Sequence, residues 1–249
     1  MTIGAVGHHY NRSMGQIYDI TTFSLLDYPD ELSCIVWMSG CNLRCVYCHN
    51  PEIVLNKGTK DAVEVVDFLK KRRGRLTAVV FSGGEATFCS DFPELVRQAH
   101  GLGFKTKLDT NGSNPDVVRA LVEEGILNYV ALDYKCPGYL AERILGTAKF
   151  DEAFRHTLVS LIRAANEGKV RLEVRTTVSP AILNETDLNA MIADLDALGY
   201  RDTYWLQNIV TAGEKTLGNV PETNEVIDRT KLTQPKNFTM GYRNFPEDQ

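Results

Sequence analysis

Three of the chain's six cysteines, Cys41, Cys45 and Cys48, lie on one short stretch with the spacing C-x3-C-x2-C. Thiolates this close along a chain can converge on one inorganic centre, because each is a strong ligand for iron or zinc. Residues 1–20 contain no apolar run of the kind that a secretory signal carries. Six cysteines in such a chain favour metal or redox chemistry over a disulfide scaffold.

Four interpretations of this cysteine loop are open from the residues alone. A structural zinc site needs a fourth ligand, and although His49 is adjacent, no second Cys/His pair follows at finger spacing. The run Cys45–His49 matches the attachment pattern of a c-type haem, which normally requires export. Ordinary packing of the cysteines is the third interpretation. A [4Fe–4S] cluster with three protein ligands is favoured, and it would leave one iron open to bind a ligand.

Further polar groups and glycines gather at the ends of predicted strands. Two adjacent glycines allow the backbone to approach a ligand closely, and a carboxylate and an amine two residues apart on a strand share a face. The candidate site residues of this kind are Gly83, Gly84, Glu85, Asp109, Asn111, Asp133, Lys135, Arg175 and Gln207.

Short apolar runs alternate with helical patterns along the whole chain. The predicted strands are Ser33–Met38, Thr77–Ser82, Phe104–Asp109, Tyr129–Tyr134, Leu172–Val178 and Thr203–Gln207. The predicted helices are Asp61–Arg73, Asp91–Leu102, Pro115–Glu124, Phe150–Glu167 and Glu185–Leu198, with Gly125, Gly168 and Gly199 as left-handed C-caps after three of them. This alternation indicates parallel strands joined by helical crossovers.

The fold class is therefore α/β, and about six strand–helix units fit the length, fewer than the eight of a complete barrel. An incomplete (β/α)6 TIM-like barrel and a doubly wound open sheet both satisfy the pattern, and both bind ligands at the carboxyl ends of the strands. We expect the partial barrel, over residues 23–208. Residues 1–22 form an N-terminal extension, and residues 209–249 form a loop-rich C-terminal extension in which Asn224–Leu232 is a candidate short helix.

Composition indicates which classes of partner to expect. The formal net charge is −5, whereas nucleic-acid binders usually carry a net positive charge, so we expect no nucleic-acid partner. No run of about 18 apolar residues exists, so we expect no membrane span and a cytoplasmic location.

The cysteine loop resembles the cluster motif of the radical S-adenosylmethionine (SAM) superfamily. That resemblance implies a [4Fe–4S] cluster on Cys41, Cys45 and Cys48, whose open iron chelates SAM so that electron transfer cleaves it to methionine and a 5′-deoxyadenosyl radical. It also implies that Tyr47 packs beside the adenine. Gly83-Gly84-Glu85 is similar to the family's GGE motif, which binds the SAM ammonium group, with Glu85 as a further acceptor.

A finer resemblance is to activating enzymes of glycyl radical enzymes, and among these to the compact anaerobic ribonucleoside-triphosphate reductase activating proteins. It rests on Phe23–Pro29, on Cys48–Glu52, on the DTNG at Asp109–Gly112 and on Asp133 with Lys135. The resemblance implies that Asp27, Asp109, Asp133 and Lys135 surround the SAM carboxylate. Asn111, Arg175 and Gln207 are further candidate SAM contacts, because they lie on or after predicted strands. The resemblance also implies that a monovalent cation lies near Asp27, Asp109 and Asp133.

The implied partners are a glycyl radical enzyme as protein substrate and a flavodoxin- or ferredoxin-like electron donor. We expect no acid, base or nucleophile among the side chains, since the cofactors carry the chemistry. Three alternatives stay open: a radical SAM enzyme for a small molecule, a non-catalytic iron–sulfur carrier, and a zinc-stabilised binding module.

Overall fold

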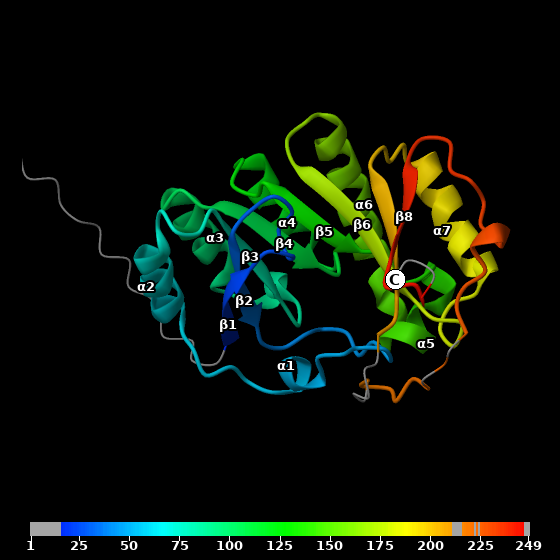
Figure 1. The fold of residues 1–249 in the computed structure, drawn as a ribbon, viewed down its shortest axis with the longest axis horizontal. Helices are drawn as coiled ribbons and strands as arrows, with labels where there is room; N and C mark the ends of the chain where they lie inside the picture. The colour runs from blue at the N-terminus through cyan, green and yellow to red at the C-terminus, as the bar shows by residue number, and fades with distance from the viewer. Residues whose placement is uncertain (1–15, 211–215, 222, 224, 247–249) are drawn as a thin grey trace, which may run out of the picture.

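The computed structural model describes residues 16–210, 216–221, 223 and 225–246, and within them eight strands form one sheet (Figure 1). The strands are β1 (Ile17–Ser24), β2 (Ser33–Met38), β3 (Ala78–Gly83), β4 (Lys105–Thr110), β5 (Tyr129–Asp133), β6 (Arg171–Val178), β7 (Thr203–Asn208) and β8 (Thr239–Arg243). The helices are α1 (Pro51–Leu55), α2 (Ala62–Arg72), α3 (Phe92–Gly101), α4 (Pro115–Glu123), α5 (Ala141–Leu145), α6 (Asp151–Asn166) and α7 (Glu185–Ala197).

The strands follow one another across the sheet in chain order. Strands β2 to β8 are parallel, and only β1 runs antiparallel to its neighbour β2. In the described part of the chain β1 and β8 each have a single neighbour, so the sheet does not close. The α/β class and the incomplete barrel are therefore confirmed.

The six predicted strands and the five predicted helices between residues 33 and 208 are all present, with each end displaced by at most one residue. Gly125, Gly168 and Gly199 have φ values of 70°, 74° and 73°, as left-handed C-caps require. Two strands and two helices were not predicted. Strand β1 lies on an edge and does not alternate cleanly between apolar and polar residues, and β8, α1 and α5 have five residues each, too few to show a hydrophobic period.

The two expected extensions contribute to the same sheet as the central segment. Strand β1 crosses the border drawn at residue 22, and β8 lies within residues 209–249. The short helix expected at Asn224–Leu232 is wrong, because the described residues there form only a 3-10 turn at Arg229–Lys231; residue 224 itself lies outside the described residues.

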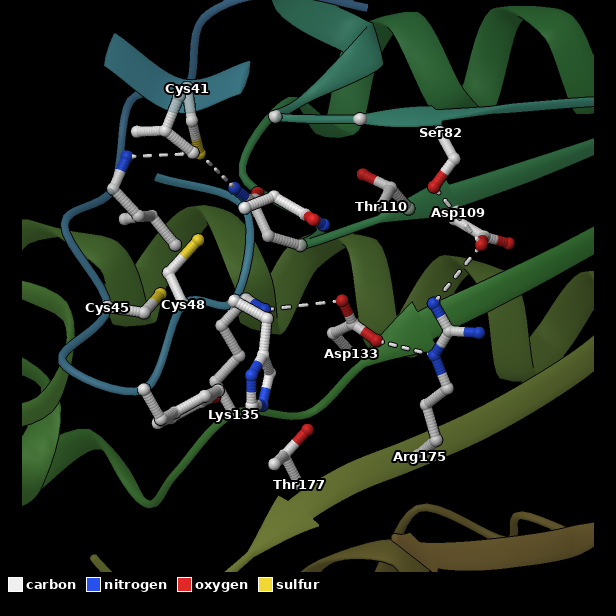
Figure 2. A pocket seen from close by; sticks show the side chains of 18 of the residues that line it. Cys41, Cys45, Cys48, Ser82, Asp109, Thr110, Asp133, Lys135, Arg175 and Thr177 are labelled. Carbon is white, nitrogen blue, oxygen red and sulfur yellow. Dashed lines mark hydrogen bonds and ion pairs between the residues drawn. The ribbon is translucent and has the colours of Figure 1, made fainter. Parts of the chain in front are cut away.

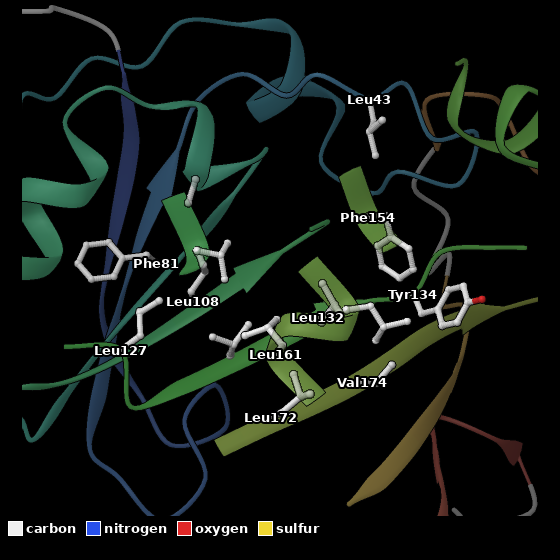
Figure 3. Packing of buried hydrophobic residues seen from close by; sticks show 14 of the residues in the cluster. Leu43, Phe81, Leu108, Leu127, Leu132, Tyr134, Phe154, Leu161, Leu172 and Val174 are labelled. Carbon is white, nitrogen blue, oxygen red and sulfur yellow. The ribbon is translucent and has the colours of Figure 1, made fainter. Parts of the chain in front are cut away.

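The core lies on the two faces of the sheet. On the outer face, Phe81, Leu108, Leu132 and Leu172 come from four adjacent strands and pack in one cluster with Leu161 of α6 (Figure 3). On the inner face, Tyr28, Ile35, Ala78, Val80 and Tyr129 form a second, smaller apolar cluster. Burial on both faces explains why β3 and β5 read as continuous apolar runs.

No helix among the described residues has both the length and the apolar character needed to cross a membrane.

Candidate functional site

The three loop cysteines line one cavity of about 230 Å³ at the carboxyl ends of the strands. In Figure 2 the thiols of Cys41, Cys45 and Cys48 lie on one side of this cavity, opposite Asp133 and Arg175. The predicted location at the strand ends is confirmed, because β3 to β7 all contribute lining residues.

The loop that carries the cysteines is held by chain segments from far along the sequence. The amides of Arg44 and Val46 donate to carbonyls of α5, at 3.0 and 2.9 Å. The Leu217 amide donates to the Cys48 carbonyl at 3.0 Å, and the Gly218 amide donates to the Val46 carbonyl at 2.7 Å. Because its backbone is anchored on two sides, the loop can present its thiols in a fixed arrangement.

Burial disfavours the thiolate form of two of these cysteines, Cys41 and Cys45. Burial raises the pKa of Cys41 to about 11 and also raises the pKa of Cys45, while the nearby Lys135 ammonium works against it. The Leu43 amide lies 3.4 Å from the Cys41 sulfur, positioned to donate to it. A cysteine must be a thiolate to bind iron, so loading the site with iron releases protons.

The residues present fit an iron–sulfur cluster bound by three thiolates. Three cysteines line one cavity, and polar groups for a small ligand line the rest of the same cavity. Among the described residues, no three histidine, cysteine or carboxylate side chains are grouped closely enough to hold one metal ion. Cys34, Cys89 and Cys136 do not line the cavity and are buried in the hydrophobic core.

The two glycines at the end of β3 allow the chain to pack against the cysteine loop. A Cβ on Gly84 would lie 1.9 Å from the Gly40 carbonyl oxygen, and a Cβ on Gly83 would lie 2.3 Å from that of Met38. Gly83 also has a φ of +125°, which residues other than glycine rarely adopt. Both glycines line the cavity, and the next amide, of Glu85, donates to the Gly40 carbonyl at 2.9 Å.

Glu85 is a predicted site residue, but it does not line the cavity. Its Oε1 accepts from the Thr110 hydroxyl at 2.7 Å and from both the amide and the hydroxyl of Thr87, and its Oε2 accepts from the Asn111 amide at 2.7 Å. Burial raises its pKa, and these hydrogen bonds oppose the rise. Both oxygens are committed, so Glu85 braces the DTNG turn and is not placed as an acceptor for a ligand.

The DTNG turn brings an amide to the cysteine loop. Asn111 lines the cavity, and its Nδ2 donates to the Asn42 side chain at 3.0 Å and lies 3.9 Å from the Cys41 sulfur. Gly112 has a φ of +77°, which the turn requires. The DTNG turn therefore places Asn111 in the site.

Alternating charges from β4, β5 and β6 form the opposite wall. Arg175 Nε donates to Asp133 Oδ1 at 2.6 Å, and an Arg175 terminal nitrogen lies 3.3 Å from Asp109 Oδ2. Lys135 Nζ lies 3.2 Å from Asp133 Oδ2. Burial alone would raise the pKa of Asp133, but the charges of Arg175 and Lys135 outweigh it and lower that pKa to about 2.

Of the remaining predicted residues, Tyr47 and Gln207 reach the cavity and Asp27 does not. Tyr47 is buried beneath Lys135, whose Nζ lies 5.9 Å from the ring centroid, and Gln207 lines the far end from β7. Asp27 does not line the cavity, because its carboxylate contacts the Ser24 hydroxyl. The lining residues that sequence reasoning missed are Leu43, His49, Asn50, Val54, Ser82, Thr110 and Thr177.

Two of the missed residues carried a usable signal. Thr177 lies two positions after Arg175 on β6, and Ser82 lies at the end of β3 beside Gly83, so strand periodicity places both side chains on the inner face. Leu43 and Val54 are apolar and carry no such signal.

Comparisons with known proteins agree on one family. A model described as the radical SAM superfamily matches residues 35–189. A Methanocaldococcus jannaschii relative, provisionally named a glycyl-radical enzyme activating enzyme, is 33% identical over 174 residues, which are 68% of this chain and 70% of that protein.

Other relatives match over shorter segments. An S-adenosylmethionine-dependent nucleotide dehydratase of Flammeovirga pacifica is 29% identical over 62% of this chain and 55% of its own length. The pyruvate formate-lyase-activating enzyme of Clostridium pasteurianum is 34% identical over 40% of this chain and 44% of its own length. This chain therefore spans about half of either protein.

A solved structure shows the same fold. Streptococcus suis SuiB, bound to its precursor peptide SuiA, superposes with a TM-score of 0.60 and 15% identity over 77% of this chain and 42% of that chain. The family model covers well over half of the chain, and the first relative agrees over two thirds of both proteins. With three cysteines and a polar wall around one cavity, this chain belongs to the radical SAM superfamily, whose enzymes use a [4Fe–4S] cluster and SAM.

Proposed function

We propose that this protein is a radical SAM activase, which abstracts a Cα hydrogen from a glycine of a partner glycyl radical enzyme. The expected partner is an anaerobic ribonucleotide reductase. The observation that carries the proposal is the shared cavity: three thiols form one side, and the charges of Asp133, Lys135 and Arg175 form the other.

Each side of this cavity has its own binding task. We assign Cys41, Cys45 and Cys48 to the cluster. SAM is assigned to the opposite wall, with the backbone of Gly83 and Gly84, the side chains of Asp109, Asn111, Asp133, Lys135 and Gln207, and the Tyr47 ring beside the adenine. Arg175 fixes the two carboxylates in place, and Glu85 fixes the turn that carries Asn111.

The cluster, held by Cys41, Cys45 and Cys48, would supply one electron to cleave SAM into methionine and a 5′-deoxyadenosyl group that can take up a hydrogen atom. The electron comes from a flavodoxin- or ferredoxin-like donor. The glycine hydrogen ends on 5′-deoxyadenosine, and the radical stays on the glycine of the partner. The protein's own part is to bind, orient and exclude water.

Two observations support a protein as the substrate. The Methanocaldococcus jannaschii relative carries a name for this activity, and the alignment with this chain covers 70% of that protein's length. A glycine on a protein loop needs lateral access, and in the described residues β1 and β8 leave the sheet unclosed. We assign residues 209–249, which include the edge strand β8, to partner recognition.

The test has two stages, both on protein reconstituted anaerobically with iron and sulfide. In the first, reduction with SAM present is expected to give methionine and 5′-deoxyadenosine in equal amounts. Cys48→Ala is expected to abolish this cleavage, whereas Cys89→Ala, a buried cysteine that does not line the cavity, is expected to retain it. Retained cleavage in Cys48→Ala would contradict the ligand assignment.

In the second stage, the protein is mixed with the glycyl radical enzyme encoded nearest to it. Electron paramagnetic resonance is expected to show a glycyl radical, and none when the target glycine of the partner is replaced by alanine. SAM cleavage without a radical on any candidate, but stimulated by a small molecule, would replace this proposal with the small-molecule alternative.

A further inference from the structure

The amine of Lys107 is buried inside the barrel. It lies behind the charged cavity wall of Asp109, Asp133, Lys135 and Arg175, to which SAM is assigned and which we call the SAM wall. Lys107 lies in the middle of β4, two residues before Asp109 and on the same face, and its side chain is 5% exposed. Its Nζ donates to the Asp27 carbonyl oxygen at 2.5 Å, lies 3.1 Å from Asp109 Oδ1, and lies 5.0 Å from the Tyr129 ring centroid. Sequence analysis did not select this lysine.

These contacts compensate a charge that would otherwise be costly to bury. An ammonium group away from water needs a counter-charge and hydrogen-bond acceptors. The Asp27 carbonyl, the Asp109 carboxylate and the face of the Tyr129 ring supply them from three separate segments. Asp109 Oδ1 is itself buried and accepts no hydrogen bond of good geometry from the described residues, so the Lys107 ion pair is its compensation.

A second cation bridges the two carboxylates. Arg175 lies 3.3 Å from Asp109 and 2.6 Å from Asp133, so the space between these side chains holds a guanidinium group. Three cations, Lys107, Lys135 and Arg175, thus face two carboxylates, Asp109 and Asp133.

This arrangement does not fit the monovalent cation that the family resemblance implies. The Asp27 carboxylate contacts the Ser24 hydroxyl, and the backbone carbonyl oxygen of Asp27 accepts a hydrogen bond from Lys107. Asp109 is contacted by Lys107 and Arg175, and Asp133 by Arg175 and Lys135. A further cation would add a fourth positive charge to two carboxylates that are already paired.

We propose that Lys107 is a built-in cation that positions Asp109, so that this protein binds SAM without a monovalent metal ion. The inference rests on the SAM site of the proposed function and not on the identity of the partner protein. Lys107 acts through Asp109 and is a positioning residue.

The test measures the dissociation constant of SAM by calorimetry on the reconstituted protein, in about 0.1 M potassium chloride and in choline chloride of the same ionic strength. Wild-type affinity is expected to agree within about twofold between the two salts. Lys107→Ala removes the amine together with the three carbons that carry it, which leaves room for a small cation beside Asp109. Its affinity for SAM is therefore expected to fall about tenfold or more in choline and to recover in potassium or ammonium.

Two further variants separate this role from a structural one. Lys107→Met fills the same space with an apolar chain, so its affinity is expected to fall in both salts without recovery. Lys105→Ala changes an exposed lysine on the same strand and is expected to match the wild type. Thermal unfolding of each variant in both salts reports whether the fold is intact.

Three results would overturn the inference. These are a wild type that loses about tenfold in SAM affinity without potassium, a Lys107→Ala variant that binds like the wild type in both salts, and a weakened Lys107→Ala variant that potassium and ammonium do not restore. A missing glycyl radical on the partner would leave these measurements unaffected, so failure of the proposed function is distinguishable.

Discussion

At the scale of single residues, the site is organised by groups whose charges compensate one another. Asp133 shows this most directly, because the charges of Arg175 and Lys135 lower its pKa to about 2 even though burial opposes them. Glu85 illustrates a different role, since both its oxygens accept hydrogen bonds from the chain. Residue type alone could not distinguish an acceptor for SAM from a brace, because both roles call for a carboxylate at the end of a strand.

The Asp133 ion pairs predict a pH dependence of stability. A carboxyl group whose pKa is lowered on folding stabilises the protein above its ordinary pKa of 3.8, and this contribution is lost as the pH falls through 3.8 toward 2. It amounts to about 2 kcal/mol at pH 7. Urea unfolding between pH 5 and pH 2.5 is expected to show this loss in the wild type and a shallower decline in Asp133→Asn. Equal slopes would mean that the ion pairs do not stabilise the fold.

At the scale of elements, the glycine turn after β3 determines how closely two loops pack. Gly83 and Gly84 meet the backbone of Met38 and Gly40, with no room for a Cβ at either position. A backbone oxygen cannot move aside as the end of a flexible side chain can. The turn therefore couples the position of the cysteine loop to the end of β3.

Gly84→Ala tests this packing. We expect the variant to lose roughly 2–4 kcal/mol of unfolding free energy and to incorporate less iron per chain, because the cysteine loop must shift. Gly101→Ala is the matched control: its Cβ would meet nothing within 4 Å, and it lies in the last turn of α3, so it should be neutral or slightly stabilising. Equal iron content in the two variants would contradict the coupling.

Sequence predicted the repetitive elements well and the irregular ones poorly. The apolar runs of β3 and β5 and the amphipathic helices α3 and α4 carry clear patterns, so their ends fall within one residue of the prediction. Strand β1 mixes apolar and polar residues without a clean alternation, and β8 contains a glycine over which the Trp205 ring packs. Such elements form through tertiary contacts, which a short sequence window does not contain.

The candidate site divides in the same way. Cys41, Cys45 and Cys48 were found because their spacing is characteristic, and Asp133 with Lys135 because they end a strand. Lys107 was missed, since a lysine in the middle of a strand is normally solvated. Asp27 and Tyr129 come from other segments of the chain, and their contacts with Lys107 hold it behind the SAM wall.

At the scale of the whole molecule, an ion pair links the last strand to the site. Arg243 of β8 binds Glu173 of β6 through two hydrogen bonds, at 2.8 and 2.9 Å, and the Tyr129 hydroxyl donates to the same carboxylate at 2.8 Å. Glu173 is buried, and it lies 4.0 Å from Arg175, which holds Asp109 and Asp133. The C-terminal strand is thereby connected to the SAM wall.

Arg243→Met is expected to cost about 2 kcal/mol of unfolding free energy, because it leaves the Glu173 carboxylate buried without its main partner. Lys231→Met, which removes an exposed surface pair with Asp228, should cost no more than about 0.5 kcal/mol. In a double-mutant cycle with Glu173→Gln, we expect a coupling energy of roughly 1–3 kcal/mol. Additive effects would show that the two side chains do not act together.

The attachment of the cysteine loop to Leu217 and Gly218 has a consequence for biosynthesis. The carbonyls of Val46 and Cys48 find their donors about 170 residues later in the chain, at Leu217 and Gly218. A nascent chain on the ribosome therefore carries its three thiols through most of translation before the segment that orders them emerges. Metal insertion then follows the emergence of Leu217 and Gly218, and a ribosome stalled before Leu217 is expected to hold a chain that acquires no iron.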